Sequence, residues 1–191
     1  MPEPYAVRIE ALRAGIENAG IAAAVLSRPQ HVFYYSGTMP GREPHFLVVT
    51  PRMVMAVAPA GLPGVGTFVY SSYDIHKGWS VPDAAAAALE QALSVAGTVG
   101  KTLGVELPFL GANFLPVVQK RSADCLDIGD LLWRLRRYRD AGEMLQIEAN
   151  IVANDRLHAR LRALIRAGAA EFDLWGTFIP ICARPLGALW G

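Results

Sequence analysis

The chain has 191 residues and a formal net charge of +1, with 52% hydrophobic and 18% charged residues. This balance favours a packed globular protein over a disordered one, and the length suits one well-buried domain plus an appendage. No apolar run reaches the roughly 18 residues of a membrane helix, and the N-terminus lacks the layout of a signal peptide. No extended basic face indicates nucleic acid, and the two cysteines are isolated. We therefore expect a cytoplasmic protein that binds neither nucleic acid nor a membrane.

Strand and helix patterns alternate over the first two thirds of the chain. The wholly apolar run over 21–26 is typical of a strand buried on both faces, and the runs over 46–50 and 53–57 flank a Pro-Arg turn as a hairpin. The remaining patterns predict helices over 4–18, 30–35, 81–96 and 111–120, and strands over 67–70, 103–105 and 125–128. This order predicts an α/β fold in which a mixed β-sheet is covered by helices.

The last third of the chain is predicted to be helical. A basic helix over 131–139 precedes Asp140, which can exchange capping-box hydrogen bonds with Glu143. A long helix then runs over 143–167 and is closed by Gly168. We place a domain boundary near Asp140, which leaves residues 140–191 as a helical C-terminal extension. Its apolar residues recur at helical spacing and would lie exposed without a covering domain, which predicts self-association.

Three short motifs carry a family resemblance. Arg136, Arg139 and Glu143 follow the spacing Arg-x-x-Lys-x-x-x-Glu with arginine in place of lysine, and Gly168 with Glu171 resembles a Gly-x-x-Glu motif. Residues 34–37, Tyr-Tyr-Ser-Gly, resemble an aromatic turn that ends in glycine. In this order along an α/β pattern, the motifs resemble the creatinase / Xaa-Pro aminopeptidase / prolidase family. The resemblance implies a ribonuclease-H-like N-terminal domain over 1–139 and, over 140–191, the first helices of a truncated "pita-bread" catalytic domain.

Four residues are candidates for substrate binding. Tyr34 and Tyr35 belong to the aromatic turn, although two aromatics before a glycine more often serve packing. Arg42 and His45 follow the turn. The resemblance implies that this loop reaches the active site of a partner subunit, where a guanidinium can hold a carboxylate through two parallel hydrogen bonds. A solvated loop arginine and a surface or capping histidine are equally compatible with the sequence.

A metal site is not expected in this chain. Asp74 and His76 could point the same way along a strand, but two ligands do not make a site. The family builds its centre from Asp, Asp, His, Glu and Glu, whereas only Asp173 among these residue types follows Glu171 here. We therefore expect no cofactor, and a divalent metal only if a catalytic domain is supplied.

The resemblance implies an N-terminal dimerisation and substrate-cleft domain that is catalytically incomplete by itself. One alternative is a subunit of a metallo-aminopeptidase or amidinohydrolase that is completed in trans by a separate catalytic chain. Another is a stand-alone domain that binds a small molecule or peptide. The expected partners are a second copy of the chain or a catalytic-domain partner, and a peptide or small amino-acid derivative as ligand.

Overall fold

The computed structural model describes residues 3–72, 76 and 80–176. The chain divides into two compact units, Met1–Arg137 and Tyr138–Gly191. This division falls two residues before the boundary predicted from the sequence. That the second unit begins a catalytic domain remains a prediction.

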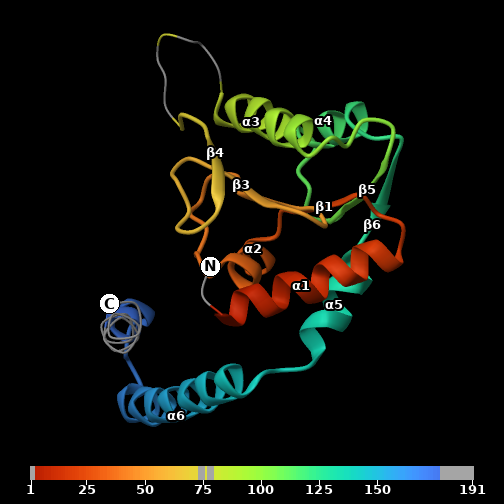
Figure 1. The fold of residues 1–191 in the computed structure, drawn as a ribbon. Helices are drawn as coiled ribbons and strands as arrows, with labels where there is room; N and C mark the ends of the chain where they lie inside the picture. Colours follow the sequence, from red (N-terminus) through yellow and green to blue (C-terminus); the bar gives the residue numbers. More distant parts are fainter. Residues whose placement is uncertain (1–2, 73–75, 77–79, 177–191) are drawn as a thin grey trace. The chain divides into compact units, whose positions relative to one another are not determined.

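The first unit is built on a six-stranded mixed sheet (Figure 1). Its strands are β1 (Ala23–Leu26), β2 (Phe46–Val49), β3 (Val54–Ala58), β4 (Gly66–Val69), β5 (Thr102–Val105) and β6 (Asp124–Asp127), in the spatial order β4-β3-β2-β1-β5-β6. The pairs β1–β2 and β2–β3 are antiparallel, and the other three pairs are parallel. The predicted α/β fold class, with a mixed sheet, is confirmed.

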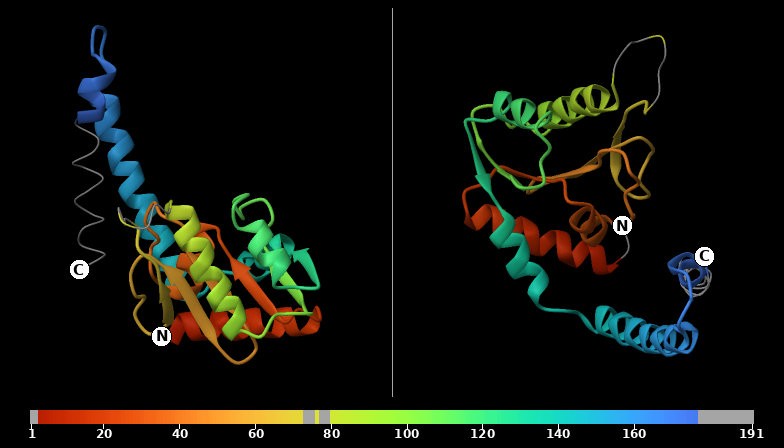
Figure 2. Two further views of the ribbon diagram at one scale, coloured as in Figure 1. Left: turned by 90° about the horizontal axis from the view of Figure 1, so that it is seen from above. Right: turned by 180° about the vertical axis from the view of Figure 1, so that it is seen from behind.

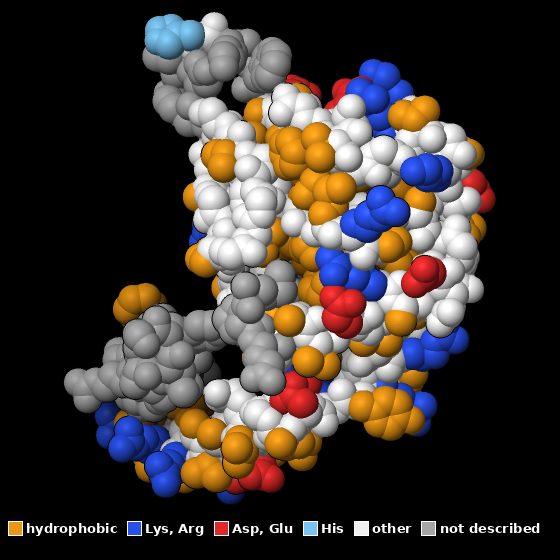
Figure 3. Space-filling model, viewed as in Figure 1, with side chains coloured by type: hydrophobic (Ala, Val, Ile, Leu, Met, Phe, Trp, Pro, Cys, Tyr) orange, Lys and Arg blue, Asp and Glu red, His pale blue; other side chains and the backbone are white. Residues whose placement is uncertain are grey.

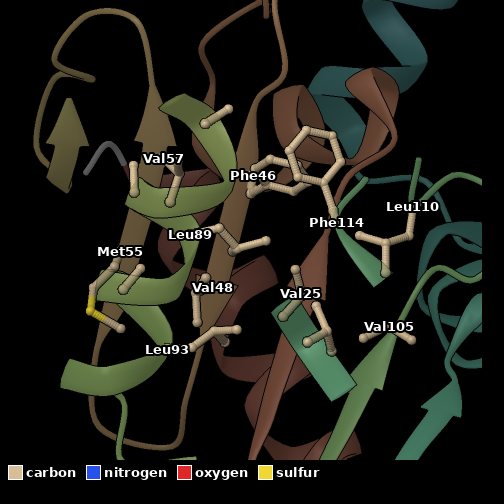
Figure 4. Packing of buried hydrophobic residues seen from close by; sticks show 14 of the residues in the cluster. Val25, Phe46, Val48, Met55, Val57, Leu89, Leu93, Val105, Leu110 and Phe114 are labelled. Atoms are coloured by element: carbon tan, nitrogen blue, oxygen red, sulfur yellow. The ribbon is translucent and has the colours of Figure 1, made fainter. Parts of the chain in front are cut away.

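Helices cover both faces of this sheet (Figures 1 and 2). One face carries α1 (Glu3–Asn18), α2 (Pro29–Ser36) and α5 (Gly129–Arg137), and the other carries α3 (Val81–Val95) and α4 (Leu115–Lys120). Side chains from alternate positions of β1, β2, β3 and β5 pack under α3 and α4 (Figure 4). The opposite side chains of β1, β2 and β3 pack on α1, α2 and α5. The central strands are therefore buried on both faces, as the apolar run over 21–26 predicted.

Two local predictions need correction. The helix predicted over 111–120 begins only at Leu115, after a turn over 112–114. Pro116 explains the late start, because proline is well accommodated in the first turn of a helix, where its missing N–H costs no hydrogen bond. The long helix predicted over 143–167 is α6 (Ala141–Leu164), and Ile165 already has extended backbone angles.

The described part of the second unit is dominated by α6. Asp140 Oδ1 accepts from the Glu143 N–H at 2.7 Å and Glu143 Oε2 accepts from the Asp140 N–H at 3.2 Å, so the predicted capping box is confirmed. Met144, Ile147 and Ile151, on the first half of α6, are exposed, whereas Leu157 on its second half is buried. The first half of α6 thus presents an apolar surface. Among the described residues, none of the helices combines the length and apolar character that crossing a membrane requires.

We predict that Gly104 is required for packing between the sheet and α5. A Cβ atom at this position in β5 would lie 2.5 Å from Ile128 Cγ2 and 3.2 Å from Ile21 Cγ2. Gly104→Ala should therefore lower the free energy of unfolding by about 1–3 kcal/mol, as overpacked core substitutions do. Gly66→Ala is the matched control, since a Cβ on this strand glycine would meet nothing within 4 Å. Urea unfolding followed by circular dichroism measures both, and equal losses would contradict the packing argument.

We also predict that residues 1–139 fold without the rest of the chain. This part contains all six strands and the helices that cover them, and a domain of this size can support its own core. Limited proteolysis should cut first between Asp140 and Trp175, because most residues of the long helix α6 are exposed. Initial cleavage in the 59–66 loop, with cooperative loss of the remainder, would show instead that α6 is integral to the fold.

Candidate functional site

The two tyrosines of the aromatic turn lie in the core. They belong to the last turn of α2, where Tyr34 and Tyr35 are only 8% and 0% exposed. Their rings meet edge to face with centroids 5.0 Å apart. Burial raises the pKa of Tyr35, and the neighbouring Tyr34 raises it further to a smaller extent. No described group forms a hydrogen bond with the Tyr35 hydroxyl. Both residues therefore fix α2 from within the domain.

The other two candidates lie on the loop between α2 and β2. Arg42 is exposed, and His45 is half-buried with its Nδ1 2.7 Å from the carbonyl oxygen of Glu43. The loop end is held by Tyr70, whose hydroxyl donates to the Pro44 carbonyl at 2.6 Å. The pKa of Tyr70 is raised to about 12, mainly by burial and to a smaller extent by the nearby carboxylate of Glu43. The structure thus separates the four candidates into a core pair and a loop pair.

Gly37 sets the direction in which this loop leaves α2. It caps the helix in the left-handed region with φ of +75°, and its N–H donates to the Phe33 carbonyl at 2.8 Å. A Cβ at Gly37 would lie 2.6 Å from Cε2 of Tyr5 on α1. Both the backbone angle and the close approach of the Tyr5 ring therefore require glycine.

Two arginines hold α2 against its neighbours. The guanidinium carbon of Arg8, on α1, lies 4.2 Å from the centre of the Tyr34 ring, and that of Arg136, on α5, lies 5.1 Å from it. Arg8 Nη1 also donates to the Tyr34 carbonyl at 3.1 Å. Arg136, one of the motif residues of the family resemblance, thus acts in this unit as a cation against an aromatic face.

A buried polar cluster that the sequence analysis did not find lies at the other end of α2. Glu106 directly follows β5 and is 1% exposed. Its Oε2 accepts from the N–H groups of Ser27 and Arg28 at 2.8 and 3.0 Å, and its Oε1 pairs with Nδ1 of His31. The N-cap residue of α2, Arg28, makes no side-chain cap of its own. The carboxylate of Glu106 instead accepts from the two amides that lead into the helix, and its negative charge is favourable beside the positive end of the helix dipole.

The cluster occupies the place where sheets of this kind usually bind ligands. The parallel strands β1 and β5 end side by side. The chain then continues from β1 to α2 on one face and from β5 to α4 on the other (Figure 1). Such a divergence of connections opens a crevice at the carboxyl ends of the strands. Here the carboxylate of Glu106 accepts from the amides that an external anion would use, and it is buried rather than exposed to solvent.

The possible metal ligands do not gather in the described part of the chain. No group of three or more His, Cys, Asp or Glu side chains that could hold a metal occurs among those residues. His76 is exposed, and Asp74 lies outside the described residues, so the structure does not test that pair. For the buried cluster around Glu106, the only signal in the sequence is a charged residue directly after the apolar strand 103–105.

Comparison with protein families matches residues 8–138 to the creatinase/prolidase N-terminal domain. Comparison with curated protein sequences gives no match.

Solved structures with this fold include a prolidase and a dipeptidase that are about twice as long as the chain. The prolidase from Pyrococcus horikoshii is 14% identical with a TM-score of 0.71, and the match covers 94% of this chain and 49% of that one. Dipeptidase PepE from Mycobacterium ulcerans is 21% identical with a TM-score of 0.66, covering 95% and 49%. This chain therefore spans about half the length of both relatives.

A shorter solved structure matches about two thirds of the chain. A proline dipeptidase chain from Streptococcus pneumoniae is 15% identical with a TM-score of 0.54, and the match covers 69% of this chain and 98% of that one. That solved chain thus consists almost entirely of the matched part. At these identities the likenesses establish the fold.

We predict that Glu106 is the most sensitive polar residue of the first unit. Glu106→Ala would leave two amides and His31 without their acceptor, which should lower the free energy of unfolding by about 3 kcal/mol. Glu106→Gln keeps one oxygen acceptor and should cost less. Glu17→Ala, on the exposed side of α1, is the control and should change stability little. Urea unfolding of the four proteins tests this order, and a loss for Glu106→Ala no larger than that of the control would refute it.

Proposed function

Because the chain belongs to the creatinase/prolidase N-terminal domain family, we propose that it is the dimerisation and substrate-cleft part of a two-part Xaa-Pro dipeptidase-like protein. In this proposal the chain is catalytically incomplete by itself, and the second part supplies the reacting groups. The substrate class would be peptides that carry proline, as the names of the structural relatives indicate.

The observation that supports this proposal is how little of each structural relative the match covers. About 95% of this chain matches the relatives, yet the match accounts for only about half of each full-length relative. A protein of this kind therefore has a second half, of similar size, without counterpart in this chain. The described residues offer no donor set for a metal, so we assign no metal-dependent step to them.

The loop between α2 and β2 is the best candidate for contact with substrate. Its ends are fixed at Gly37 and by the Tyr70–Pro44 hydrogen bond, while Arg42 remains exposed between them. A guanidinium on a loop with fixed ends can hold a carboxylate in a set direction. We therefore assign Arg42 to recognition of the substrate carboxylate and His45 to the same loop surface. Tyr34 and Tyr35 support this role from the core by holding α2.

The exposed apolar surface on the first half of α6 favours a second part that docks on this chain. Met144, Ile147 and Ile151 recur at helical spacing and stay exposed. Such a surface suits either a further segment of the same polypeptide or a separate catalytic chain acting in trans. In both arrangements the activity belongs to the assembled protein.

We predict that the purified chain alone does not hydrolyse Xaa-Pro dipeptides when manganese or cobalt is added. The Pyrococcus horikoshii prolidase serves as the positive control in the same assay. Turnover by this chain that is retained through purification to homogeneity would overturn the proposal.

Calorimetric titration with the same dipeptides distinguishes the two-part proposal from the alternative that the chain is a stand-alone binding domain. A stand-alone binder should show saturable binding that is weakened by Arg42→Ala and unaffected by Arg52→Ala, an exposed arginine of the β2–β3 turn. The two-part proposal expects no such saturable binding by the chain alone.

A further inference from the structure

The carboxylate of Glu106 is surrounded by donors that belong to another part of the chain. The N–H groups of Ser27 and Arg28 donate to one of its oxygens, and Nδ1 of His31 pairs with the other. Glu106 is 1% exposed and His31 is 5% exposed. All three partner groups follow β1, whereas Glu106 follows β5. The arrangement is therefore that of a small buried receptor and the anion bound in it.

The donors are held in place by contacts that do not involve the Glu106 side chain. Ser27 directly follows β1, which pairs with both β2 and β5. The Arg28 carbonyl accepts from the N–H groups of His31 and Val32 at 2.9 and 3.0 Å, which fixes the first turn of α2. The donor groups should therefore keep their positions when the carboxylate is removed.

The backbone of Glu106 is also held independently of its side chain. Its carbonyl accepts from the N–H groups of Phe109 and Leu110 at 2.9 and 2.8 Å. The guanidinium carbon of Arg28 lies 4.6 Å from the centre of the Phe109 ring, which joins the segments after β1 and β5 a second time. Glu106→Ala removes a CH₂–COO⁻ unit from between these segments. That unit corresponds atom for atom to acetate.

We propose that the turn after β1, together with His31, is a binding site for a small monocarboxylate, which the Glu106 side chain of the same chain occupies. Two amides on one oxygen and a ring nitrogen on the other suit a planar group with two acceptor oxygens. A phosphate or sulfate would bring further oxygens, for which these contacts provide no donor, and a buried oxygen without a donor is unfavourable.

The covalent link explains why Glu106 is the occupant in the unmodified chain. A tethered group is present at a high effective concentration, so a free carboxylate should not displace it. A substrate carboxylate would accordingly need other donors, such as the guanidinium of Arg42. The inference does not depend on the proposed function, because it concerns this chain alone and needs no second part.

Acetate rescue of Glu106→Ala tests the proposal on the full chain. Urea unfolding is measured at pH 7 in rising sodium acetate, with sodium chloride keeping the ionic strength constant. Because acetate would bind the folded state, the unfolding equilibrium constant should fall tenfold for each tenfold rise in acetate above its dissociation constant. The unmodified chain corrects for general salt effects. A dependence on acetate no steeper than that of the unmodified chain would overturn the proposal.

A second variant separates a carboxylate site from nonspecific stabilisation. Leu103→Ala also opens a cavity from β5, but Leu103 lies in a cluster of hydrophobic side chains. Lys and Arg side chains on the face of the first unit in Figure 3 are interspersed with Asp and Glu rather than gathered into one patch, and this surface is the same in both variants. Acetate should not rescue Leu103→Ala, and uncharged acetamide should rescue Glu106→Ala less than acetate does. Equal rescue in either comparison would refute the site.

Amide NMR spectra show where acetate binds. In Glu106→Ala, added acetate should move the N–H resonances of Ser27 and Arg28 back toward their positions in the unmodified chain, while those of α4 stay in place. If this variant is unfolded in chloride, acetate should instead restore the circular dichroism of the folded chain. Unchanged Ser27 and Arg28 resonances, or an unfolded variant that acetate does not refold, would contradict the proposal.

Discussion

One buried carboxylate connects the main parts of the sheet domain. Glu106 stands at the end of β5 and accepts hydrogen bonds from the backbone that leaves β1 for α2. It therefore joins two neighbouring parallel strands and the helix start on which the aromatic turn depends. A carboxylate in this position could not remain buried without its donors, because desolvation of an unpaired charge costs several kcal/mol. The amides of Ser27 and Arg28 and the ring of His31 compensate that cost.

The position of the exposed loop follows from this anchoring of α2. Glu106 and His31 hold the first turn of the helix, while Arg8 and Arg136 lie against Tyr34 near its last turn. Helix α2 is only eight residues long, and a helix of that length has little stability of its own. Tertiary contacts at both ends therefore determine where Gly37 and the loop that carries Arg42 begin.

The backbone amides that follow β1 are bound within the domain. The buried carboxylate of Glu106 links the ends of β1 and β5, and other surfaces of the described residues are exposed. These are the loop at Arg42, the uncharged edge at β4 and the apolar first half of α6.

The sequence by itself determined the α/β class, the hairpin, the capping box at Asp140 and the family. Those features depend on neighbours along the chain: apolar runs, the Pro-Arg turn, the Asp140–Glu143 capping box and short motifs. Only the tertiary structure decided that β4 pairs parallel to β3, that Tyr34 and Tyr35 are core residues and that Glu106 is buried. Glu106 and its amide partners are nearly 80 positions apart. The local sequence marks a charged residue after the strand but not its burial or its donors, because its desolvation is compensated only once β1 and β5 lie side by side.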